Sequence, residues 1–400
     1  MNLVEIKDFG FSYPESSRKV LEHVNLNIKE GTLNVIMGRS GCGKSTLLRQ
    51  LKSVLAPAGE KEGEILYRNI PLRDTDHRTQ SQEIGFVMQN PDNQIVTDKV
   101  WHELAFGLES LGYDNATIRL RVAEMASYFG IQKWFYKNVS ELSGGQKQLL
   151  NLASVMAMHP SLLILDEPTS QLDPIAASDF LETVKKINRD IGTTVLLTEH
   201  RLQDIIPYAD QVFVMDEGTL FMEGTPREIG TKLKEQHHGM FLSMPVPMQI
   251  YAGTESTLTC PLTVSEGRQW IREYIEEKGI KKEQIQQANQ RLERQGEKNK
   301  NETAGLFGHF KRQKENTPPA IQMKDVWFRY EKDSPDVIQD LSLEVKKGEF
   351  YALVGGNGTG KSTTLSLLSR VHQPYKGRIY LEGKDLRSFK DNQLYCGYLG

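Results

Sequence analysis

The sequence predicts an α/β fold whose central sheet is parallel and buried on both faces. An apolar run at 162–165 leads into Asp166 and Glu167, and a second at 195–197 is followed closely by His200. Unbroken apolar runs of this kind are typical of parallel strands covered on both sides. A glycine-rich run at 38–45 is the third observation, because α/β sheets bind ligands beside loops at the carboxyl ends of their strands.

The glycine-rich run has the composition of a phosphate-binding loop. Glycines allow its backbone to turn tightly with the N–H groups directed inward, and a helix beginning near Lys44 adds its positive end. We expect Lys44 to reach the β- and γ-phosphates of a nucleotide. The predicted nucleotide contacts of this run are Gly38, Arg39, Ser40, Gly41, Cys42, Gly43, Lys44, Ser45 and Thr46.

The acidic pair is predicted to complete a hydrolytic site. We expect Asp166 and the Ser45 hydroxyl to hold Mg²⁺, an ion that proteins bind through few carboxylates together with substrate phosphates. Glu167 is the candidate general base for the attacking water. The alternative is a glycine-rich surface turn beside an ordinary acidic strand end, which does not explain why all the motifs occur in this order.

A third motif lies between the loop and the acidic pair. Its first residue follows Lys44 by 99 residues and precedes Asp166 by 23, and this signature turn comprises Ser143, Gly144, Gly145 and Gln146. Motifs in this order resemble the ATP-binding cassette (ABC) family. The resemblance implies a P-loop NTPase with a RecA-like core, an antiparallel β-subdomain at the start and a helical subdomain around residues 90–150. It also implies that ATP lies between the phosphate loop of one cassette and the signature turn of another.

Single residues extend the resemblance. Tyr13 resembles the aromatic residue that stacks on adenine, Gln89 the Q-loop glutamine that touches Mg²⁺ or water, and His200 the switch histidine that contacts the γ-phosphate. Taken alone, such a tyrosine is more often a core residue and such a histidine more often structural. Residues 170–173 resemble the D-loop that signals between paired cassettes, although Gln171 departs from the small residue common there.

The pattern begins again near residue 320. Tyr330 precedes Lys361 by 31 residues, as Tyr13 precedes Lys44, and this equality makes coincidence implausible. We expect a second, incomplete copy of the fold, because residue 400 is reached before a second Q-loop glutamine would occur. The chain is then either part of a longer tandem protein or in need of a partner cassette. The predicted contacts of the second site, in which Ser362 is the metal ligand, are Tyr330, Gly355, Gly356, Asn357, Gly358, Thr359, Gly360, Lys361, Ser362 and Thr363.

Composition indicates an ordinary globular protein. Charged residues make up 25% of the chain and the net charge is −3, so we expect no nucleic acid as a partner. The three cysteines, Cys42, Cys260 and Cys396, are scattered without metal-ligand spacing. No apolar stretch approaches the roughly 18 residues that span a bilayer, so a transport role would need separate membrane subunits.

We expect three segments: a first cassette at 1–235, a linker at 236–319 and the second copy at 320–400. Residues 277–316 are rich in Lys, Glu, Gln and Asn, which favours a solvated spacer over a regulatory or lipid-contacting segment. A helix is predicted over 264–278, where apolar residues fall at helical spacing.

Three segments, 89–95, 105–109 and 199–202, resemble the ATPases of energy-coupling factor (ECF) importers. This resemblance implies two partners, a transmembrane coupling protein and a substrate-capture membrane subunit, and a peripheral location on the cytoplasmic face of the membrane. The implied cargo is a vitamin or precursor such as thiamine or hydroxymethylpyrimidine, with cobalt or nickel ions as the alternative. Either a groove for the coupling protein or the core of the helical subdomain would contain Trp101, Leu104 and Phe106.

A different class of tandem cassette acts on ribosomes and needs no membrane. Those proteins tend to have a more basic linker and read His-Asp-Arg at the switch histidine, whereas this chain reads Glu199-His200-Arg201. We therefore favour import.

Overall fold

The computed structural model describes residues 1–14, 18–279 and 318–389. The chain divides into two compact units, Met1–Gly279 and Ile280–Gly400, and each is presented by itself. Part of the predicted linker, residues 280–317, lies outside the described residues, as does Cys396.

The first unit opens with an antiparallel sheet of strand order β2-β1-β4-β5. Along β2 the buried residues mostly alternate with exposed ones, as expected for a strand that covers a core with one face. This sheet confirms the predicted antiparallel β-subdomain. Its strands are β1 (Asn2–Ser12), β2 (Leu21–Lys29), β4 (Glu60–Tyr67) and β5 (Ile70–Pro71).

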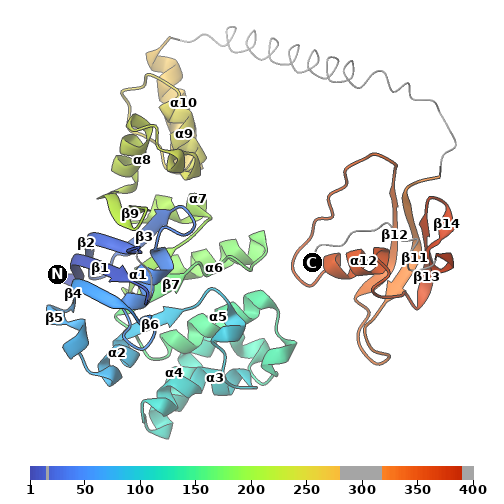
Figure 1. Ribbon diagram of the computed structural model, residues 1–400, viewed down its shortest axis with the longest axis horizontal. Coiled ribbons are helices and arrows are strands. Elements are labelled where there is room, and N and C mark those ends of the chain that lie inside the picture. Colours follow the sequence, from blue (N-terminus) through green and yellow to red (C-terminus); the bar gives the residue numbers. More distant parts are fainter. Residues whose placement is uncertain (15–17, 280–317, 390–400) are drawn as a thin grey trace. The chain divides into compact units, whose positions relative to one another are not determined.

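A second sheet of six strands, ordered β10-β9-β3-β8-β7-β6, forms the centre of this unit (Figure 1). All neighbours pair in parallel except β10, which is antiparallel to β9. Every residue of β7 and β8 is buried, as the unbroken apolar runs predict. The strands are β3 (Leu33–Gly38), β6 (Ile84–Val87), β7 (Leu162–Asp166), β8 (Thr194–Thr198), β9 (Gln211–Asp216) and β10 (Thr219–Gly224).

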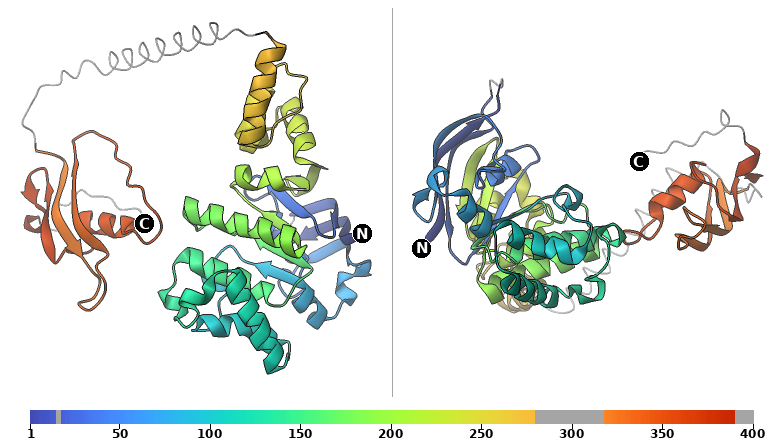
Figure 2. Two further views of the ribbon diagram at one scale, coloured as in Figure 1. Left: turned by 180° about the vertical axis from the view of Figure 1, so that it is seen from behind. Right: turned by 90° about the horizontal axis from the view of Figure 1, so that it is seen from below.

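Alternate residues of the central strands face two different cores. On β3, Val35 and Met37 join a core shared with the helices, whereas Ile36 joins the core under the antiparallel sheet. The side chains of β7 divide in the same way. Seen from behind, α6 covers the parallel sheet (Figure 2). The helices that lie between strands of the first unit and outside the helical subdomain include α1 (Lys44–Gln50), α2 (His77–Glu83), α6 (Pro174–Lys186) and α7 (Leu202–Ile205).

The helical subdomain lies where the sequence predicts it. Helices α3 and α5 pack against each other and α4 contacts both. Their shared core includes Leu104, Leu108 and Leu150, all fully buried. The three helices are α3 (Val100–Ser110), α4 (Asn115–Tyr128) and α5 (Gly144–Met156).

Residues 236–279, which the sequence assigns to the linker, fold with the first unit, so this unit extends to residue 279 and not to 235. The solvated spacer predicted over 277–316 lies almost wholly outside the described residues. Together with residues 226–235, residues 236–279 form a C-terminal appendage, 226–279, at the end of the unit opposite α3, α4 and α5 (Figure 1). The predicted helix over 264–278 is confirmed, with its last residue at 277. The elements are α8 (Pro226–Glu235), the short helix η7 (Gly239–Ser243), α9 (Val246–Ala252) and α10 (Val264–Glu277).

Buried side chains explain why the appendage is compact. Met248 is 1% exposed and packs on Gly230 of α8, where an added Cβ would lie 2.0 Å from the Met248 sulfur. Trp270 is 5% exposed, donates a hydrogen bond from Nε1 to Ser256 Oγ at 3.0 Å, and stacks on Tyr274. Few apolar residues, widely spaced, form this core, so composition alone does not reveal it.

The second unit repeats the beginning of the first. Its sheet has the order β12-β11-β13-β14, which matches β2-β1-β4-β5 strand for strand. A helix, α12, follows its glycine-rich loop as α1 follows the first one. The elements are β11 (Ile321–Phe328), β12 (Ile338–Val345), α12 (Lys361–Leu368), β13 (Lys376–Leu381) and β14 (Lys384–Asp385).

We predict that Trp270→Ala destabilises the first unit. Removal of a buried tryptophan leaves a cavity and costs about 3–5 kcal/mol of unfolding free energy. The measurement is the midpoint of thermal unfolding, together with the rate of proteolysis within residues 236–279. Ile271→Ala is the matched control, because Ile271 is 42% exposed on the same helix, and should change stability by less than about 0.5 kcal/mol. Equal midpoints for the two variants would contradict a packed appendage.

Candidate functional site

The phosphate loop connects β3 to α1. Gly41 and Gly43 have φ of 80° and 98°, in the left-handed region that favours glycine. At Gly43 an added Cβ would also lie 2.9 Å from Leu21 Cδ2, so a larger residue is excluded twice. Lys44 Nζ donates hydrogen bonds to the carbonyl oxygens of Gly38 at 3.0 Å and Arg39 at 3.1 Å. The Lys44 ammonium therefore lies on the inner side of the loop.

A cavity of about 300 Å³ brings the predicted residues together. The phosphate loop forms one side, and Glu167 and His200, from the segments after β7 and β8, form another. Because β3, β8 and β7 are neighbours in the parallel sheet, their carboxyl ends converge here. The lining residues are Val20, Ser40, Gly41, Gly43, Lys44, Ser45, Thr46, Glu167 and His200.

Asp166 is held by two hydroxyl groups. Ser45 Oγ donates to Asp166 Oδ1 at 2.8 Å, and Thr198 Oγ1 donates to the same oxygen at 3.1 Å. Burial raises the pKa of Asp166, and these two hydrogen bonds oppose that shift. Thr198 was not predicted, although it is the only hydroxyl residue between the apolar run 195–197 and His200.

The oxygen atoms of Ser45 and Asp166 suit Mg²⁺. Among the described residues no three His, Cys, Asp or Glu side chains gather into a metal cluster. One carboxylate and one hydroxyl, completed by phosphate oxygens and water, are the hard-oxygen set that Mg²⁺ prefers.

Glu167 lies between the two other catalytic candidates. Its Oε1 is 3.0 Å from His200 Nε2, and its Oε2 accepts a hydrogen bond from Gln89 Nε2 at 3.3 Å. Its φ of 46° is strained for a residue with a side chain. The backbone is held there because Glu167 N donates to the carbonyl oxygen of Thr198 at 3.2 Å and to its Oγ1 at 3.0 Å.

The Q-loop is fastened to the helix that follows the signature turn. Gln148 Nε2 donates to the carbonyl oxygen of Met88 at 3.0 Å, and Lys147 pairs with Asp92 at 2.6 Å. These contacts bracket Gln89 in the sequence and connect its position to α5. Lys147 and Gln148 were not predicted. The signal available for Gln148 was its place, with Asn151, among the mostly apolar buried positions of α5.

The signature turn begins α5. Gln146 N donates to Ser143 Oγ at 3.3 Å, and Ser143 N donates to Gln146 Oε1 at 2.9 Å, which forms a reciprocal capping box. No atom lies within 4 Å of a Cβ built on Gly144, so its backbone faces open space. Within the described first unit, none of the signature residues lines the cavity around Lys44.

The structure shows which residues lie in the core and which on the surface, where the sequence allows either position. Tyr13 is 39% exposed, and its hydroxyl lies 3.2 Å from Thr46 Oγ1, so it is a rim residue of the phosphate loop rather than part of the core. Leu104 is fully buried and belongs to the core. Trp101 and Phe106 are 41% and 38% exposed and stand on the surface of α3.

The second unit reproduces the contacts of the first loop. Lys361 Nζ donates to the carbonyl oxygens of Gly355 at 2.8 Å and Gly356 at 2.6 Å, as Lys44 does to its own loop. Tyr330 Oη lies 2.9 Å from Thr363 Oγ1, which matches the Tyr13 contact. The repeat observed in sequence is therefore also a repeat of side-chain contacts.

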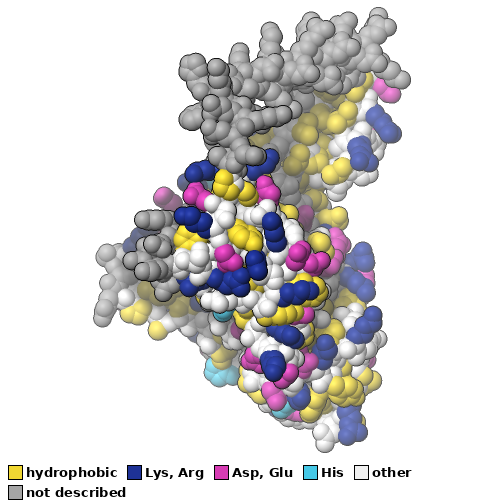
Figure 3. Space-filling view, turned by 90° about the vertical axis from the view of Figure 1, so that its right-hand side faces the viewer, with side chains coloured by type: hydrophobic (Ala, Val, Ile, Leu, Met, Phe, Trp, Pro, Cys, Tyr) yellow, Lys and Arg dark blue, Asp and Glu magenta, His cyan; other side chains and the backbone are white. Residues whose placement is uncertain are grey.

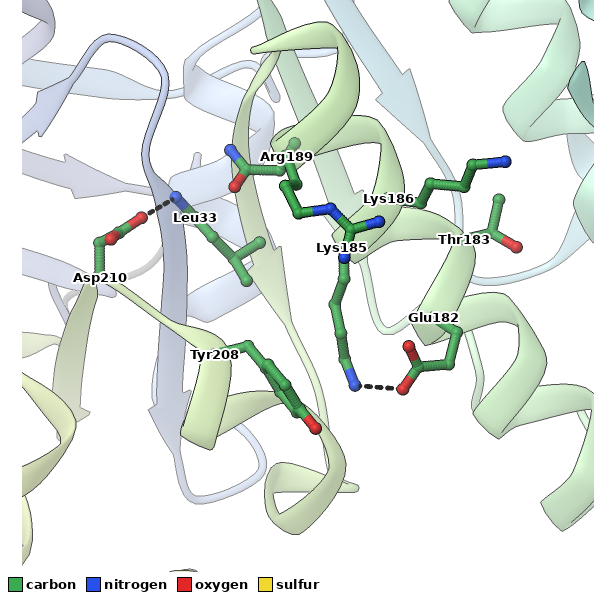
Figure 4. Close-up of a pocket in the computed structure, with 9 residues that line it drawn as sticks. Leu33, Glu182, Thr183, Lys185, Lys186, Arg189, Tyr208 and Asp210 are labelled. Atoms are coloured by element: carbon green, nitrogen blue, oxygen red, sulfur yellow. Dashed lines mark hydrogen bonds and ion pairs between the residues drawn. The ribbon is translucent and has the colours of Figure 1, made fainter. Parts of the chain in front are cut away.

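A hollow of about 500 Å³ at the carboxyl end of α6 lies apart from these residues (Figure 4). Its Lys185 pairs with Glu182 at 2.6 Å and lies 3.7 Å from the centre of the Tyr208 ring. Lys185 thus has two partners already, and none of the residues lining this hollow also lines the cavity around Lys44.

Over the face drawn in Figure 3, Lys and Arg side chains are interspersed with Asp and Glu. No helix of the described chain is both long and apolar enough to cross a membrane.

Comparisons with known proteins agree with this geometry. The ABC transporter family profile matches residues 21–170 and 338–397. An ABC transporter ATP-binding protein of Bacillus anthracis is 34% identical over 397 residues, covering 99% of this chain and 67% of that protein. A relative of the same description from Methanosarcina acetivorans is 33% identical over 413 residues, and the match covers all of this chain and 64% of that protein. The chain thus spans about two thirds of the length of these relatives.

Among solved structures, CbiO1 of Clostridium perfringens, described as part of the ABC transporter complex CbiONQ, is similar with a TM-score of 0.52 and 32% identity. The match covers 60% of this chain and 95% of CbiO1. The phosphate loop, the acidic pair at the end of β7 and the matched family profile lead to one conclusion: the chain belongs to the ABC transporter family of ATP-binding ATPases.

Proposed function

We propose that the chain is the ATP-hydrolysing subunit of an ECF-type importer, peripheral to the cytoplasmic face of the membrane. The observation that carries the proposal is the contact of Glu167 with both His200 and Gln89 at the mouth of the phosphate loop. A carboxylate held on both oxygens beside a phosphate site is suited to accept a proton from water.

Each residue of the site has a distinct part in hydrolysis. Lys44 and the loop N–H groups bind the β- and γ-phosphates. Ser45 and Asp166 would hold Mg²⁺, which neutralises phosphate charge when bound. Glu167 takes the proton of the water that attacks the γ-phosphate. His200, which contacts the Glu167 carboxylate, stabilises the negative charge of the γ-phosphate. Gln89 keeps the second carboxylate oxygen oriented.

The exposed signature turn supports a site shared between cassettes. Ser143 and the N–H groups of Gly144 and Gly145 start α5 and are free of the cavity in their own unit. Such an N-terminus binds a γ-phosphate presented by another cassette. We propose that the second unit, which repeats the loop contacts around Lys361, is part of that second cassette.

Trp101 and Phe106 support the assignment of a membrane partner. Both are exposed on α3, shortly after the Q-loop, while Leu104 on the same helix is buried. We propose that these rings contact a coupling protein, so that movement of α3 with nucleotide passes to the membrane. CbiO1, a similar structure, is described as part of the ABC transporter complex CbiONQ. The cargo we propose is a vitamin or precursor such as thiamine or hydroxymethylpyrimidine.

Glu167→Gln tests the proposal. The amide keeps the shape of the side chain but cannot accept the proton, so hydrolysis should fall roughly 10²- to 10⁴-fold while ATP still binds. Release of phosphate measures the rate, and a fluorescent ATP analogue measures binding. Turnover within about threefold of the parent chain would exclude Glu167 as the base.

A second pair of variants separates binding from chemistry. Lys44→Ala removes the charge that holds the phosphates, so the affinity for ATP should fall by about tenfold or more. His200→Ala should leave that affinity within about threefold and abolish productive hydrolysis. Equal losses of ATP affinity in the two variants would rule out the proposed part of His200.

The membrane partner is tested by Trp101→Ala combined with Phe106→Ala. On co-expression with a coupling protein, this variant should be lost from the membrane fraction while its ATP binding is unchanged, because the rings lie away from the phosphate loop. Leu120→Ala is the matched control, since Leu120 is 61% exposed on neighbouring α4. Retention of the double variant on membranes, or co-sedimentation of the parent chain with ribosomes instead, would contradict the proposal.

A further inference from the structure

Glu199, which directly precedes the switch histidine, is a buried carboxylate. It is 4% exposed, and side chains of this type are rarely buried without partners. Each of its oxygens has a donor: Thr169 Oγ1 donates to Oε1, and His200 N donates to Oε2 at 3.1 Å. The Glu199 carboxylate thus links the backbone of His200 to Thr169, which lies in the loop after β7.

The two donors offset part of the cost of burying this charge, and the pKa of Glu199 remains above its ordinary value. Burial raises the pKa of Glu199, whereas the hydrogen bonds from Thr169 and from His200 N lower it, as does the nearby His200 side chain. The negative charge of Glu167 also raises this pKa. A carboxylate that accepts two directed hydrogen bonds is a rigid link in such surroundings.

Thr169 lies in the turn that connects the base to α6. It is 3% exposed. Ser170 N donates to the Glu167 carbonyl oxygen at 3.2 Å, and Leu172 N donates to the Thr169 carbonyl oxygen at 3.0 Å, so the turn is closed by its own backbone. Asp173 ends it by capping α6 through the N–H groups of its first turn, at 3.0 Å.

The His200 ring itself is more loosely held. Its side chain is 55% exposed, and its ring contact with Glu167 is through Nε2 at 3.0 Å. A ring on an exposed side chain keeps a defined position only if its backbone is fixed. Glu199 supplies that constraint at the His200 N–H.

We propose that Glu199 and Thr169 form a positioning pair that holds His200 against Glu167 and connects the histidine to the turn 167–173. Neither residue lines the cavity around Lys44. The pair acts through His200, so its loss lowers the rate of hydrolysis and not the affinity for ATP. The inference rests on the proposed function, in which Glu167 and His200 perform hydrolysis.

The matched variants are Thr169→Val, which removes the hydroxyl but keeps the shape, and Thr169→Ser, which keeps the hydroxyl. Glu199→Gln replaces one acceptor oxygen by an NH₂ group, so one of the two hydrogen bonds is lost. Loss of a hydrogen bond to a buried charged group is large enough to lower the rate of hydrolysis by about tenfold or more. We expect this fall in kcat for Thr169→Val and Glu199→Gln, with KM for ATP within about twofold, and rescue to within about threefold in Thr169→Ser.

The double variant shows whether the two residues act as one unit. Thr169→Val with Glu199→Gln should lose no more than about tenfold, whereas independent effects would multiply to about a hundredfold. The assay is release of ³²P-phosphate from γ-labelled ATP by the full 400-residue chain at one fixed protein concentration, which detects slow turnover. The midpoint of thermal unfolding is recorded for each variant.

Three results would overturn the inference: rates within twofold of the parent chain in both single variants, multiplied losses in the double variant, or parallel falls in ATP affinity and unfolding temperature that Thr169→Ser does not rescue. If Glu199→Gln fails to fold, the comparison of Thr169→Val with Thr169→Ser decides alone. Glu167→Gln is assayed alongside. A parental rate in that variant would overturn the proposed function and this inference with it, whereas its expected loss beside near-parental rates in both Thr169→Val and Glu199→Gln overturns the inference alone.

Discussion

The site depends on one interaction, the hydrogen bonding of Thr198 at the end of β8 to both acidic residues at the end of β7. Thr198 Oγ1 donates to Asp166 Oδ1 and accepts from Glu167 N. Without this hydroxyl, Asp166 would keep only the hydrogen bond from Ser45, and Glu167 N, at a φ of 46°, would keep only the Thr198 carbonyl oxygen as its acceptor. The parallel register of the two strands places Asp166 beside Thr198, and the adjacent β3 then presents Lys44 and Ser45 to the same point.

From this point polar contacts lead outward along two routes. One goes through Gln89 and the Q-loop to α5, where Gln148 and Lys147 fasten the loop to the helix of the signature turn. The other goes through Glu199 and Thr169 to the start of α6. Both routes end at helix N-termini on the surface of the unit. Polar contacts thereby connect Glu167, the proposed base, to both of these helix ends.

The internal repeat indicates which contacts the loop itself requires. In both copies the lysine donates to two carbonyl oxygens of its own loop, and a tyrosine hydroxyl lies near the threonine two residues after that lysine. These contacts form over sequence separations of 5, 6 and 33 residues in each copy, between the loop, the start of the helix that follows it and the segment after the first strand. The loop geometry is therefore a local property of this segment, whereas the position of Glu167 and His200 requires the parallel sheet.

The sequence by itself determined the α/β class, the phosphate loop, the buried strand ending at Asp166 and the repeat, because each is encoded in residue types at short spacing. It also identified Glu167, His200 and Gln89, but only through the order of motifs. Tertiary structure alone decided their mutual contacts and the hydrogen bonds of Thr198, Thr169 and Glu199, since these join segments that lie about 30 residues apart in the chain. It likewise decided that residues 236–279 pack into the first unit, because a small core around Met248 and Trp270 forms only when α8, α9 and α10 meet.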